Sequence, residues 1–416
     1  MLTPEYLRQI TEGAENISSS LHRNIMDMII ERMMIRIGKG YDYLLTPADK
    51  WRIMVLQESG KLLEDIEKEI AEKTKKQEKE IREAFEDAGI RALQWDDAIY
   101  RAAGLSPVPL LESPTMLRLL ERDFLATSGE WKNFTRTTAV ESQRAFINEM
   151  DNAYHLVVSG GASYSQVVRD IIGKMTDVGL KVAYPTGYKM SMEAATMMIV
   201  RTGIGQAAAD ISMERMKEMD WDIVLVSAHV GARTGDGGMN PGNHLWWQGQ
   251  FYSRTGKTKK YPDFVKSTGY GSGEGLCGWN CRHSFGAGDG VNNPYSEKKI
   301  SLAENAKAEK AQQRQRLLER RIRESKREVQ NLQTAINACK DDAARLELQN
   351  KFDRKSYTLK KQNKQYEVFC DENNLKPYAE RLKVAKWDRQ QAAKAAGAAR
   401  RYENAKGEKH GDRLSC

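Results

Sequence analysis

The residues with the richest chemistry in this chain are gathered between Trp221 and Phe285. This stretch holds three of the six histidines, four of the eight tryptophans and two of the five cysteines. Imidazole and thiolate groups are the usual ligands of zinc, and they also serve as bases and nucleophiles in catalysis. Their concentration in one glycine-rich segment, between two long helical regions, predicts a functional site or a small fold that these side chains specify.

Five side chains in this stretch are candidate metal ligands: His229, His244, Cys277, Cys281 and His283. A structural zinc site takes four such ligands in tetrahedral geometry. The spacing of Cys277 and Cys281 can supply one half of a site, but the first two histidines are fifteen residues apart and form no matching pair. We therefore interpret the cysteines as small buried groups in a tight turn. A zinc site is the alternative, and no other cofactor is expected.

A metal-dependent hydrolase or nuclease that uses His229, His244 and His283 is the competing function. Such enzymes pair their metal with a carboxylate base, as in the His-Glu-x-x-His motif. Between Ser227 and Phe285 the chain contains three carboxylates, none of them in such a motif: Asp236, Asp263 and Glu274. This scarcity favours a structural role. No catalytic residue is therefore assigned, and enzymatic activity is not expected.

The elements that position these residues are mainly helical. Apolar periodicity, and a capping box at Thr74–Gln77 that opens a new helix, predict helices at Lys61–Ala71, from Thr74 onward, and at Met116–Leu125, Thr135–Val158, Tyr164–Val178 and Ser191–Met219. Glycine and proline predict breaks at Gly104–Pro109 and Tyr184–Gly187. Asp222–Ser227 is rich in β-branched residues and is predicted to be a strand. The expected fold class is mainly α with a small α+β module.

A basic helical tail is predicted after Ser301. Its apolar positions alternate by four and three, as in a coiled-coil seam of roughly four heptads: Leu318, Ile322, Ser325, Val329, Leu332, Ile336, Cys339, Ala343 and Leu346. The sequence thus divides into a helical domain at 1–220, a compact His/Cys/Trp-rich α+β module at 221–295, and a basic helical coiled-coil tail at 301–416.

The net positive charge of the chain comes from that tail. The whole chain has a formal net charge of +8, and residues 301–416 contain 28 Lys and Arg against 17 Asp and Glu. The first 300 residues contain 37 against 40 and are slightly acidic. A basic tail indicates a solvated helix or an electrostatic contact with nucleic acid or an acidic partner, and both interpretations stay open because acidic residues are interleaved. A stand-alone DNA-binding protein would need a folded basic surface instead of an interrupted coil.

Features of membrane and secreted proteins are not found in the sequence. No apolar run approaches the roughly 18–20 residues that span a bilayer, and charged residues interrupt the most apolar early patch, Ile25–Ile37. The first residues, Met1–Tyr6, do not form a secretory signal. Five scattered cysteines do not form a disulfide framework. We therefore expect synthesis in a reducing cytosol and no membrane partner.

Five motifs of the central stretch carry a family resemblance: Ser227-Ala-His-Val-Gly-Ala-Arg233, His244-Leu-Trp-Trp-Gln-Gly249, Tyr261-Pro-Asp-Phe264, Thr268-Gly-Tyr-Gly271 and Gly275-Leu-Cys-Gly-Trp-Asn-Cys-Arg-His-Ser-Phe285. In this order they resemble tailed-phage minor capsid proteins related to the phage Mu F-type head-morphogenesis proteins. The similarity covers roughly the first 295 residues. The motif residues expected to matter structurally are Ser227, His229, Gly231, Arg233, His244, Trp247, Gln248, Gly249, Cys277, Gly278, Trp279, Asn280, Cys281, Arg282 and His283.

One feature departs from the family pattern. Many relatives have the arginine and the histidine of the first motif three residues apart, whereas Thr234–Asn243 separates Arg233 from His244 here. Sequence spacing therefore does not predict that these two side chains form a pair.

The resemblance implies a virion protein that acts in head morphogenesis. Such proteins are thought to bind the portal and to lie inside the head, so the implied partners are the phage portal protein and the major capsid protein. The implied location is the inside of the capsid, after assembly in the host cytoplasm. The helical domain at 1–220 would then dock on the portal or capsid, and the basic tail would lie near packaged DNA. The family brings no established catalytic activity.

Overall fold

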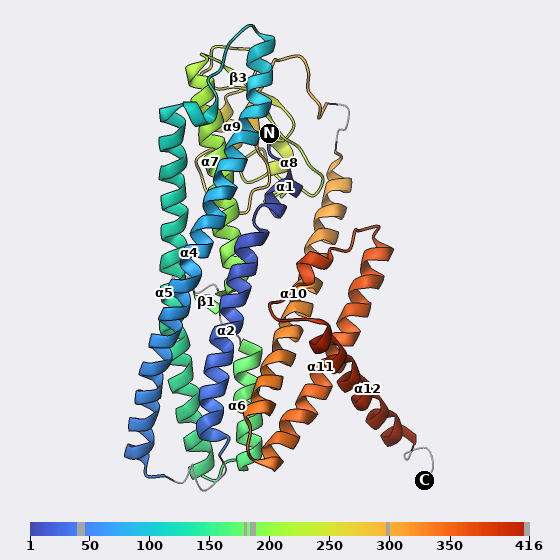
Figure 1. The fold of residues 1–416 in the computed structure, drawn as a ribbon. Helices are drawn as coiled ribbons and strands as arrows, with labels where there is room; N and C mark the ends of the chain where they lie inside the picture. Colours follow the sequence, from blue (N-terminus) through green and yellow to red (C-terminus); the bar gives the residue numbers. More distant parts are fainter. Residues whose placement is uncertain (40–45, 179–180, 184–188, 297–299, 412–416) are drawn as a thin grey trace. The chain divides into compact units, whose positions relative to one another are not determined.

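The computed structural model describes residues 1–39, 46–178, 181–183, 189–296 and 300–411 (Figure 1). The chain forms two compact units, each built from three separate segments. Unit 1 comprises Met1–Ile17, Thr74–Asn133 and Ala194–Gln313. Unit 2 comprises Ser18–Lys73, Phe134–Glu193 and Arg314–Cys416. These two units are defined by which residues pack together, whereas the division of the chain near residues 220 and 301 is inferred from sequence pattern. The three-part division therefore stays a prediction.

The fold class is confirmed, since helices dominate and the strands are few and short. The helices are α1 (Pro4–Gln9), α2 (Glu12–Ile37), α4 (Ala48–Ala102), α5 (Pro114–Val158), α6 (Tyr164–Val178), α7 (Met192–Glu218), α8 (His244–Trp247), α9 (Phe264–Thr268), α10 (Leu302–Ala338), α11 (Asp342–Glu372) and α12 (Arg389–Gly411), with 3-10 turns η1 (Leu110–Glu112) and η2 (Ala379–Leu382). The strands are β1 (Lys181–Ala183), β2 (Lys189–Ser191), β3 (Ile223–Val226), β4 (Phe251–Ser253) and β5 (Phe285–Ala287).

A helical core forms the first part of unit 1. The second half of α4, the first half of α5 and most of α7 bury their apolar faces against one another and against α1. Phe85 of α4 meets Phe124 of α5 edge to face at 6.3 Å between ring centroids, and Ile204 of α7 is fully buried in the same core. The buried apolar residues recur at helical spacing, so each helix presents one apolar stripe to this core.

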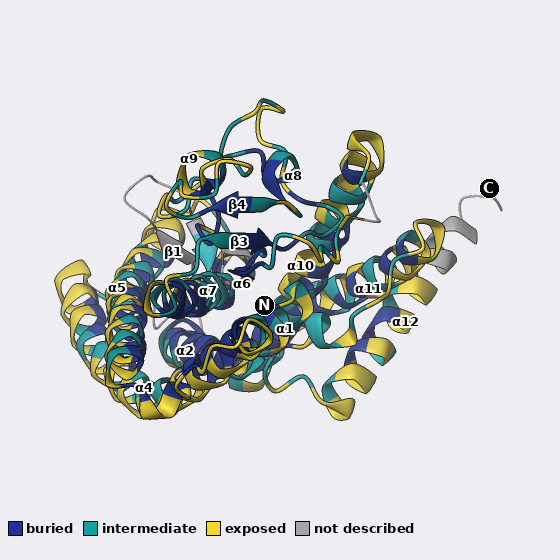
Figure 2. Ribbon diagram, turned by 90° about the horizontal axis from the view of Figure 1, so that it is seen from above, coloured by how far each residue is buried: buried dark blue, intermediate teal, exposed yellow. Residues whose placement is uncertain are grey.

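The small sheet forms the second part of unit 1. Strand β3 lies in the centre, antiparallel to both β4 and β5, with Val224 opposite Tyr252 on one side and Ala287 on the other. Figure 2 shows β3 and β4 between α7 on one side and α8 and α9 on the other. Tyr100 of α4 and Met216 of α7 share a core with the sheet. The irregular central segment is therefore fixed on a helical platform.

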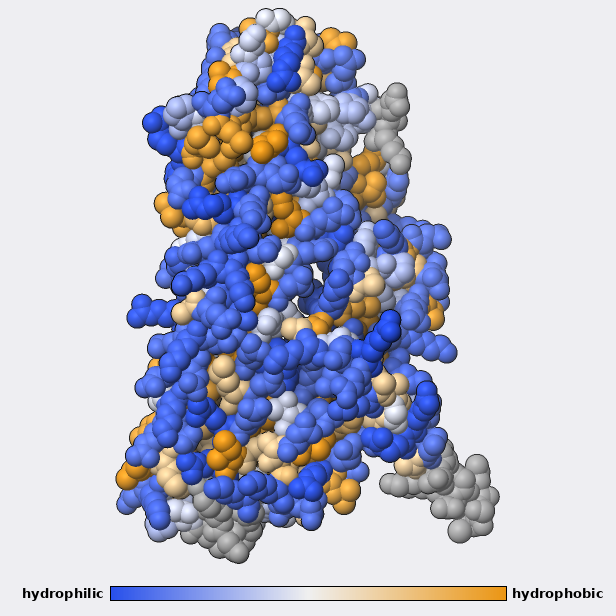
Figure 3. Space-filling model, viewed as in Figure 1, coloured by the Kyte–Doolittle hydropathy of each residue, from blue (hydrophilic) through white to orange (hydrophobic). Residues whose placement is uncertain are grey.

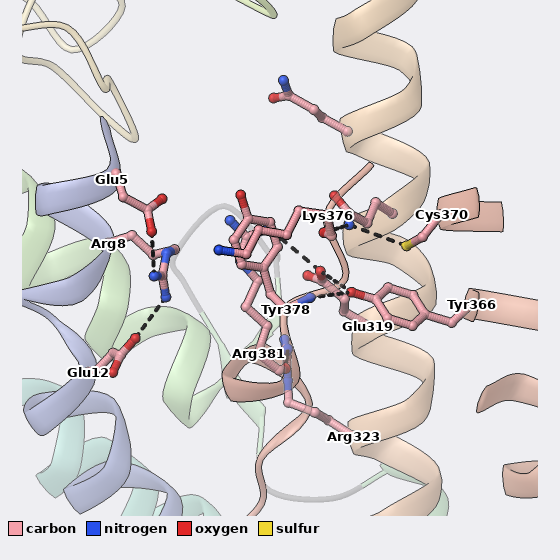
Figure 4. Close-up of polar contacts among 12 residues, drawn as sticks. Glu5, Arg8, Glu12, Glu319, Arg323, Tyr366, Cys370, Lys376, Tyr378 and Arg381 are labelled. Carbon is pink, nitrogen blue, oxygen red and sulfur yellow. Dashed lines mark hydrogen bonds and ion pairs between the residues drawn. The ribbon is translucent and has the colours of Figure 1, made fainter. Parts of the chain in front are cut away.

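In unit 2, α10 and α11 pack together as an antiparallel hairpin. Leu318 and Ile322 of α10 share a core with Leu359, Tyr366 and Cys370 of α11. Glu319 is buried beside them, where it accepts a hydrogen bond from the Tyr366 hydroxyl at 3.2 Å and lies 3.5 Å from the Arg381 guanidinium (Figure 4). Burial raises the pKa of Glu319. The apolar stripe of the tail is thus covered within the chain.

The predicted heptad seam is correct only in α10. Its positions from Leu318 to Leu332 are buried, but α10 ends at Ala338 and Leu346 is 63% exposed. The side chain of Asp341 accepts a hydrogen bond from the backbone N–H of Ala344 and so starts a new helix with a different buried face. One continuous seam from Leu318 to Leu346 is therefore wrong, because the helix is interrupted and its phase changes.

Two predicted helix boundaries are also wrong. Thr74 lies inside α4 and opens no new helix, and the helices predicted at Met116–Leu125 and Thr135–Val158 are parts of the single helix α5. No proline or buried cap interrupts either stretch, so local start signals do not outweigh helix propagation. The boundaries of α6 are confirmed at both ends, and those of α7 to within one residue. The predicted turn at Tyr184–Gly187 lies outside the described residues.

No helix in the described part of the chain is both long enough and apolar enough to cross a bilayer.

Candidate functional site

The segments after β3 and before β5 bring two histidines face to face. Ser227 continues β3 and pairs with Ser284: its N–H donates to the Ser284 carbonyl and its Oγ accepts the Ser284 N–H, each at 2.9 Å. The rings of His229 and His283 then stack with centroids 4.3 Å apart and planes 23° apart. An extended backbone pairing therefore places histidines from two distant motifs together.

The inserted loop brings the third histidine to the same place. The N–H of His244 donates to the carbonyl of Arg233 at 2.8 Å, which closes the loop Thr234–Asn243 on itself. As a result Arg233 Nη2 lies 2.8 Å from His244 Nε2, although sequence spacing did not predict this pair. Trp247 is fully buried against the His244 ring, with centroids 4.5 Å apart, and its indole N–H donates to the Pro241 carbonyl at 2.9 Å.

A tight turn orients the two cysteines differently. Cys277 and Asn280 both adopt positive φ, at 60° and 56°. Gly278 between them packs so closely that a Cβ there would lie 2.3 Å from the carbonyl oxygen of Gly273. Because only glycine tolerates this approach, the turn fixes which thiol points toward the histidines.

Cys281 is the thiol that reaches the histidines. Its Sγ lies 3.8 Å from His244 Nδ1 and 3.7 Å from His283 Nδ1, and these three atoms lie within 4.8 Å of one another. The Cys277 thiol is directed to the backbone carbonyl of His283 at 3.8 Å instead. Three of the five candidate ligands thus converge, His229 stacks on their edge, and Cys277 lies outside the group.

Trp279, one of the residues that the sequence predicts to be structural, is an exposed member of this turn. Its side chain is 63% exposed and covers the backbone of Gly273, whereas the other tryptophan of the cluster, Trp247, is fully buried. The positive φ of Asn280 turns the chain outward at this point, so Trp279 lies on the surface of the turn.

Burial controls the charge of the cluster. It lowers the pKa of His244 to about 4 and lowers the pKa of His283 well below its usual value, and the neighbouring histidines and arginines act in the same direction on His283. Burial also raises the pKa of the Cys281 thiol. Removing charged groups from water disfavours their charged forms. At neutral pH both imidazoles are therefore neutral and carry a free lone pair.

Two carbonyl groups fix the orientation of these imidazoles. Gln248 Oε1 lies 2.8 Å from His283 Nε2 and also accepts the backbone N–H of His229 at 3.0 Å. The backbone carbonyl of Glu274 lies 2.8 Å from His244 Nε2 and also accepts from Arg233 at 3.0 Å. A carbonyl oxygen only accepts hydrogen bonds, so His283 Nε2 carries the proton and His283 Nδ1 is left as the acceptor. His244 Nε2 also faces the Arg233 guanidinium, which only donates, so these contacts do not fix the tautomer of His244.

Asn305, at the start of α10, is a site residue that sequence reasoning missed. It is fully buried, and its Oδ1 accepts the N–H groups of Gly231 and Ala232 at 2.8 and 3.0 Å. Its Nδ2 donates to the carbonyl of Ala232 at 2.8 Å. Gly231 has a φ of 81°, and the side chain of Asn305 holds that turn. A lone asparagine in a polar helix gives no sequence signal for this contact.

The other motif residues have supporting positions around the cluster. Gly249 has a φ of 68°, and its N–H donates to the Ser227 carbonyl at 3.3 Å. Arg282 Nη1 lies 3.5 Å from Gln312 of α10. Asn280 Oδ1 accepts a hydrogen bond from Arg201 of α7 at 2.8 Å. These contacts attach the module to the surrounding helices.

The side chains of the three carboxylates between Ser227 and Phe285 do not contact this cluster. The Asp236 carboxylate accepts a hydrogen bond from the N–H of Gly238 at 3.0 Å, within its own loop. The Asp263 carboxylate accepts one from the N–H of Lys266 at 2.8 Å and so caps the start of α9. Glu274 is an exposed residue and contributes only its backbone carbonyl. The cluster therefore provides candidate metal ligands, and none of these three carboxylate groups lies beside them.

A comparison with protein families matches residues 2–368 to a model described as phage minor capsid protein 2. The matched range includes the His/Cys cluster and extends through most of the α10–α11 hairpin. No curated protein and no solved structure matches the chain.

Proposed function

Because the chain belongs to the phage minor capsid protein 2 family, we propose that it acts in head morphogenesis as a portal-associated protein inside the capsid. The observation that carries the proposal is the extent of the match, residues 2–368, which includes most of both compact units. The partners are then the portal protein and the major capsid protein, and assembly takes place in the host cytoplasm.

Exposed apolar side chains supply a surface for such assembly. The part of unit 1 where α4 ends and α5 begins exposes five of them: Ile90, Leu105, Val108, Leu111 and Leu117. Figure 3 shows hydrophobic side chains gathered on the surface near these helix ends. Contiguous exposed apolar surface is typical of protein interaction sites. Leu111 is 59% exposed, so a charged replacement there changes the surface without emptying the core.

Co-expression with the cognate portal protein tests this role. The two proteins should co-elute in size exclusion, and Leu111→Glu should weaken the complex at least tenfold while leaving the melting temperature unchanged. Val291→Glu is the matched control, because Val291 is 80% exposed in unit 1 but lies outside the apolar stretch. Separate elution of the unmodified proteins at micromolar concentration would contradict portal association.

A weak contact between the tail and packaged DNA is a second proposal. Arg354, Lys360, Lys361 and Lys364 of α11 are exposed, which favours it. Internal ion pairs neutralise part of the charge: Lys360 lies 2.6 Å from Glu403 and Lys355 lies 2.9 Å from Glu328. The contact is therefore expected to be weak and independent of base sequence.

A further inference from the structure

The geometry points to a structural zinc site in unit 1, and we propose that His244 Nδ1, Cys281 Sγ and His283 Nδ1 bind a single Zn²⁺ ion. The site is independent of the portal and DNA contacts proposed above. It would hold together the two motifs that supply these residues, His244–Gly249 and Gly275–Phe285.

The two sulfur–nitrogen distances are close to those of a zinc site. With Zn–N near 2.05 Å and Zn–S near 2.3 Å, tetrahedral coordination places nitrogen and sulfur about 3.6 Å apart. Cys281 Sγ lies 3.8 Å from His244 Nδ1 and 3.7 Å from His283 Nδ1. A small inward movement of these side chains would bring all three atoms into bonding distance of one ion.

Hydrogen bonding around the thiol is compatible with a metal ion. The Gln248 carbonyl fixes the proton of His283 on Nε2, so His283 Nδ1 presents a lone pair to the Cys281 thiol. His244 Nε2 lies between the Arg233 guanidinium, which donates, and the Glu274 carbonyl, which accepts, so both tautomers of His244 fit its contacts. A Zn²⁺ ion would select the tautomer in which the Glu274 carbonyl accepts the Nε2 proton and Nδ1 is the ligand.

The surroundings are those of a metal site with its supporting shell. Histidine ligands of zinc commonly donate their second ring N–H to a carbonyl, which fixes the tautomer and orients the ring. Gln248 has that role for His283, and the Glu274 carbonyl lies within hydrogen-bonding distance of His244 Nε2. His244 and His283 are only 2% and 3% exposed. Because structural zinc sites are closed whereas catalytic ones keep an open position, this burial indicates a structural ion.

His229 is the side-chain candidate for the fourth position, and water is the other. Its Nε2 is buried and has no hydrogen-bond partner within the described part of the chain, while its Nδ1 lies 3.2 Å from the Val230 carbonyl. Because its ring stacks on His283 with the planes 23° apart, the ring of His229 must turn before its Nε2 can reach an ion bound in the plane of His283. On binding, Zn²⁺ replaces the proton of the Cys281 thiol, which passes to solvent, and the neutral imidazoles lose no proton. The site then carries a net charge of +1.

Metal analysis of the full-length chain tests the site. After purification without chelators, plasma mass spectrometry should return about one zinc per chain. Replacing zinc by Co²⁺ should give the visible absorption of a tetrahedral ion and a near-ultraviolet thiolate-to-cobalt band. Cys281→Ser should abolish that band, and His244→Ala and His283→Ala should each reduce bound metal to below about a tenth of an equivalent.

The matched control is Cys277→Ser, a buried thiol four residues away that lies outside the ligand set. It should keep full zinc content and an unchanged cobalt spectrum. Cobalt titration of the unmodified chain after metal removal needs no variant, so misfolding of a variant cannot hide the answer. Failure of the unmodified chain to bind either ion, or equal loss in Cys277→Ser and Cys281→Ser, would overturn the proposal. Full metal content in His229→Ala would assign the fourth position to water.

Discussion

Gln248 joins two histidine segments of unit 1 through one amide oxygen. It accepts from the His229 backbone and from the His283 ring, and its side chain is 8% exposed. Gln248→Ala would leave both N–H groups buried without partners, at a cost of about 1–3 kcal/mol for each group. Urea unfolding should show this loss, and zinc affinity should fall about 10- to 100-fold.

Gln250→Ala is the matched control for this prediction. Gln250 is an exposed residue two positions away, and its amide donates only to the Trp246 carbonyl. Its removal should change the unfolding free energy by less than about 0.5 kcal/mol. Equal losses for the two variants would show that the Gln248 carbonyl does not orient the cluster.

Asp96 of α4 makes the stability of unit 1 depend on pH. It is fully buried, and its Oδ1 accepts the N–H of Ala287 in β5 at 2.8 Å. Burial raises the pKa of Asp96 from 3.8 to about 7. Between these values the folded chain keeps a proton that the unfolded chain has lost, so stability falls as pH rises, by up to about 1.4 kcal/mol per pH unit.

Asp96→Asn should remove this slope between pH 4 and 7 and stabilise the chain at pH 8, because the amide oxygen still accepts the Ala287 N–H without a charge. Thermal unfolding across that pH range measures the effect. Glu83→Gln, an exposed change on the same helix, should leave the slope as it is. A slope that persists in Asp96→Asn would assign the pH dependence to another group.

At the residue scale, sequence reasoning identified the right side chains but not their partners. Residue type and clustering identified His244, Cys281 and His283 as chemically distinctive. The choice of Cys281 over Cys277 depends on a positive-φ turn, and the pairing of Arg233 with His244 depends on how a ten-residue loop closes. Neither depends on spacing along the chain, so neither could be predicted from it.

At the element scale, the start of α11 is a local feature with a measurable effect. The Asp341 side chain accepts the N–H of Ala344 at 2.8 Å and begins the helix. Asp341→Ala should destabilise the first turn by about 0.5–2 kcal/mol. Hydrogen exchange of peptides covering 341–350 should accelerate accordingly. Asp342→Ala, whose side chain is 93% exposed, is the control, and equal acceleration in both variants would contradict the capping role.

Element type was predictable, whereas element length was not. The limits of α6 and the strand at β3 follow from clear periodicity between strong breakers. In α4 and α5 the predicted breaks rested on favourable starting residues, and the helices continue through them. The opposite error occurred in the tail, where a regular apolar spacing continued across the real break before Asp341. Periodicity reports a buried face, but tertiary packing decides where the helix ends.

At the scale of the whole molecule, the charge of the tail predicts weak, salt-dependent binding to DNA. The unmodified chain should bind duplexes of unrelated sequence weakly and equally. Each phosphate contact releases counterions, so a few contacts should cost about tenfold or more in affinity between 50 and 200 mM salt. Fluorescence anisotropy over a salt series measures this. Lys361→Glu combined with Lys364→Glu should weaken binding, and binding insensitive to salt would remove the proposal.

The central claim is that this protein lies inside the phage head beside the portal. Quantitative mass spectrometry of purified virions, with and without protease treatment before the heads are opened, tests it most directly. The chain should be present in intact virions, protected from protease until opening, and depleted from heads assembled without portal protein. Absence from purified virions, or complete digestion while the heads remain closed, would contradict the claim.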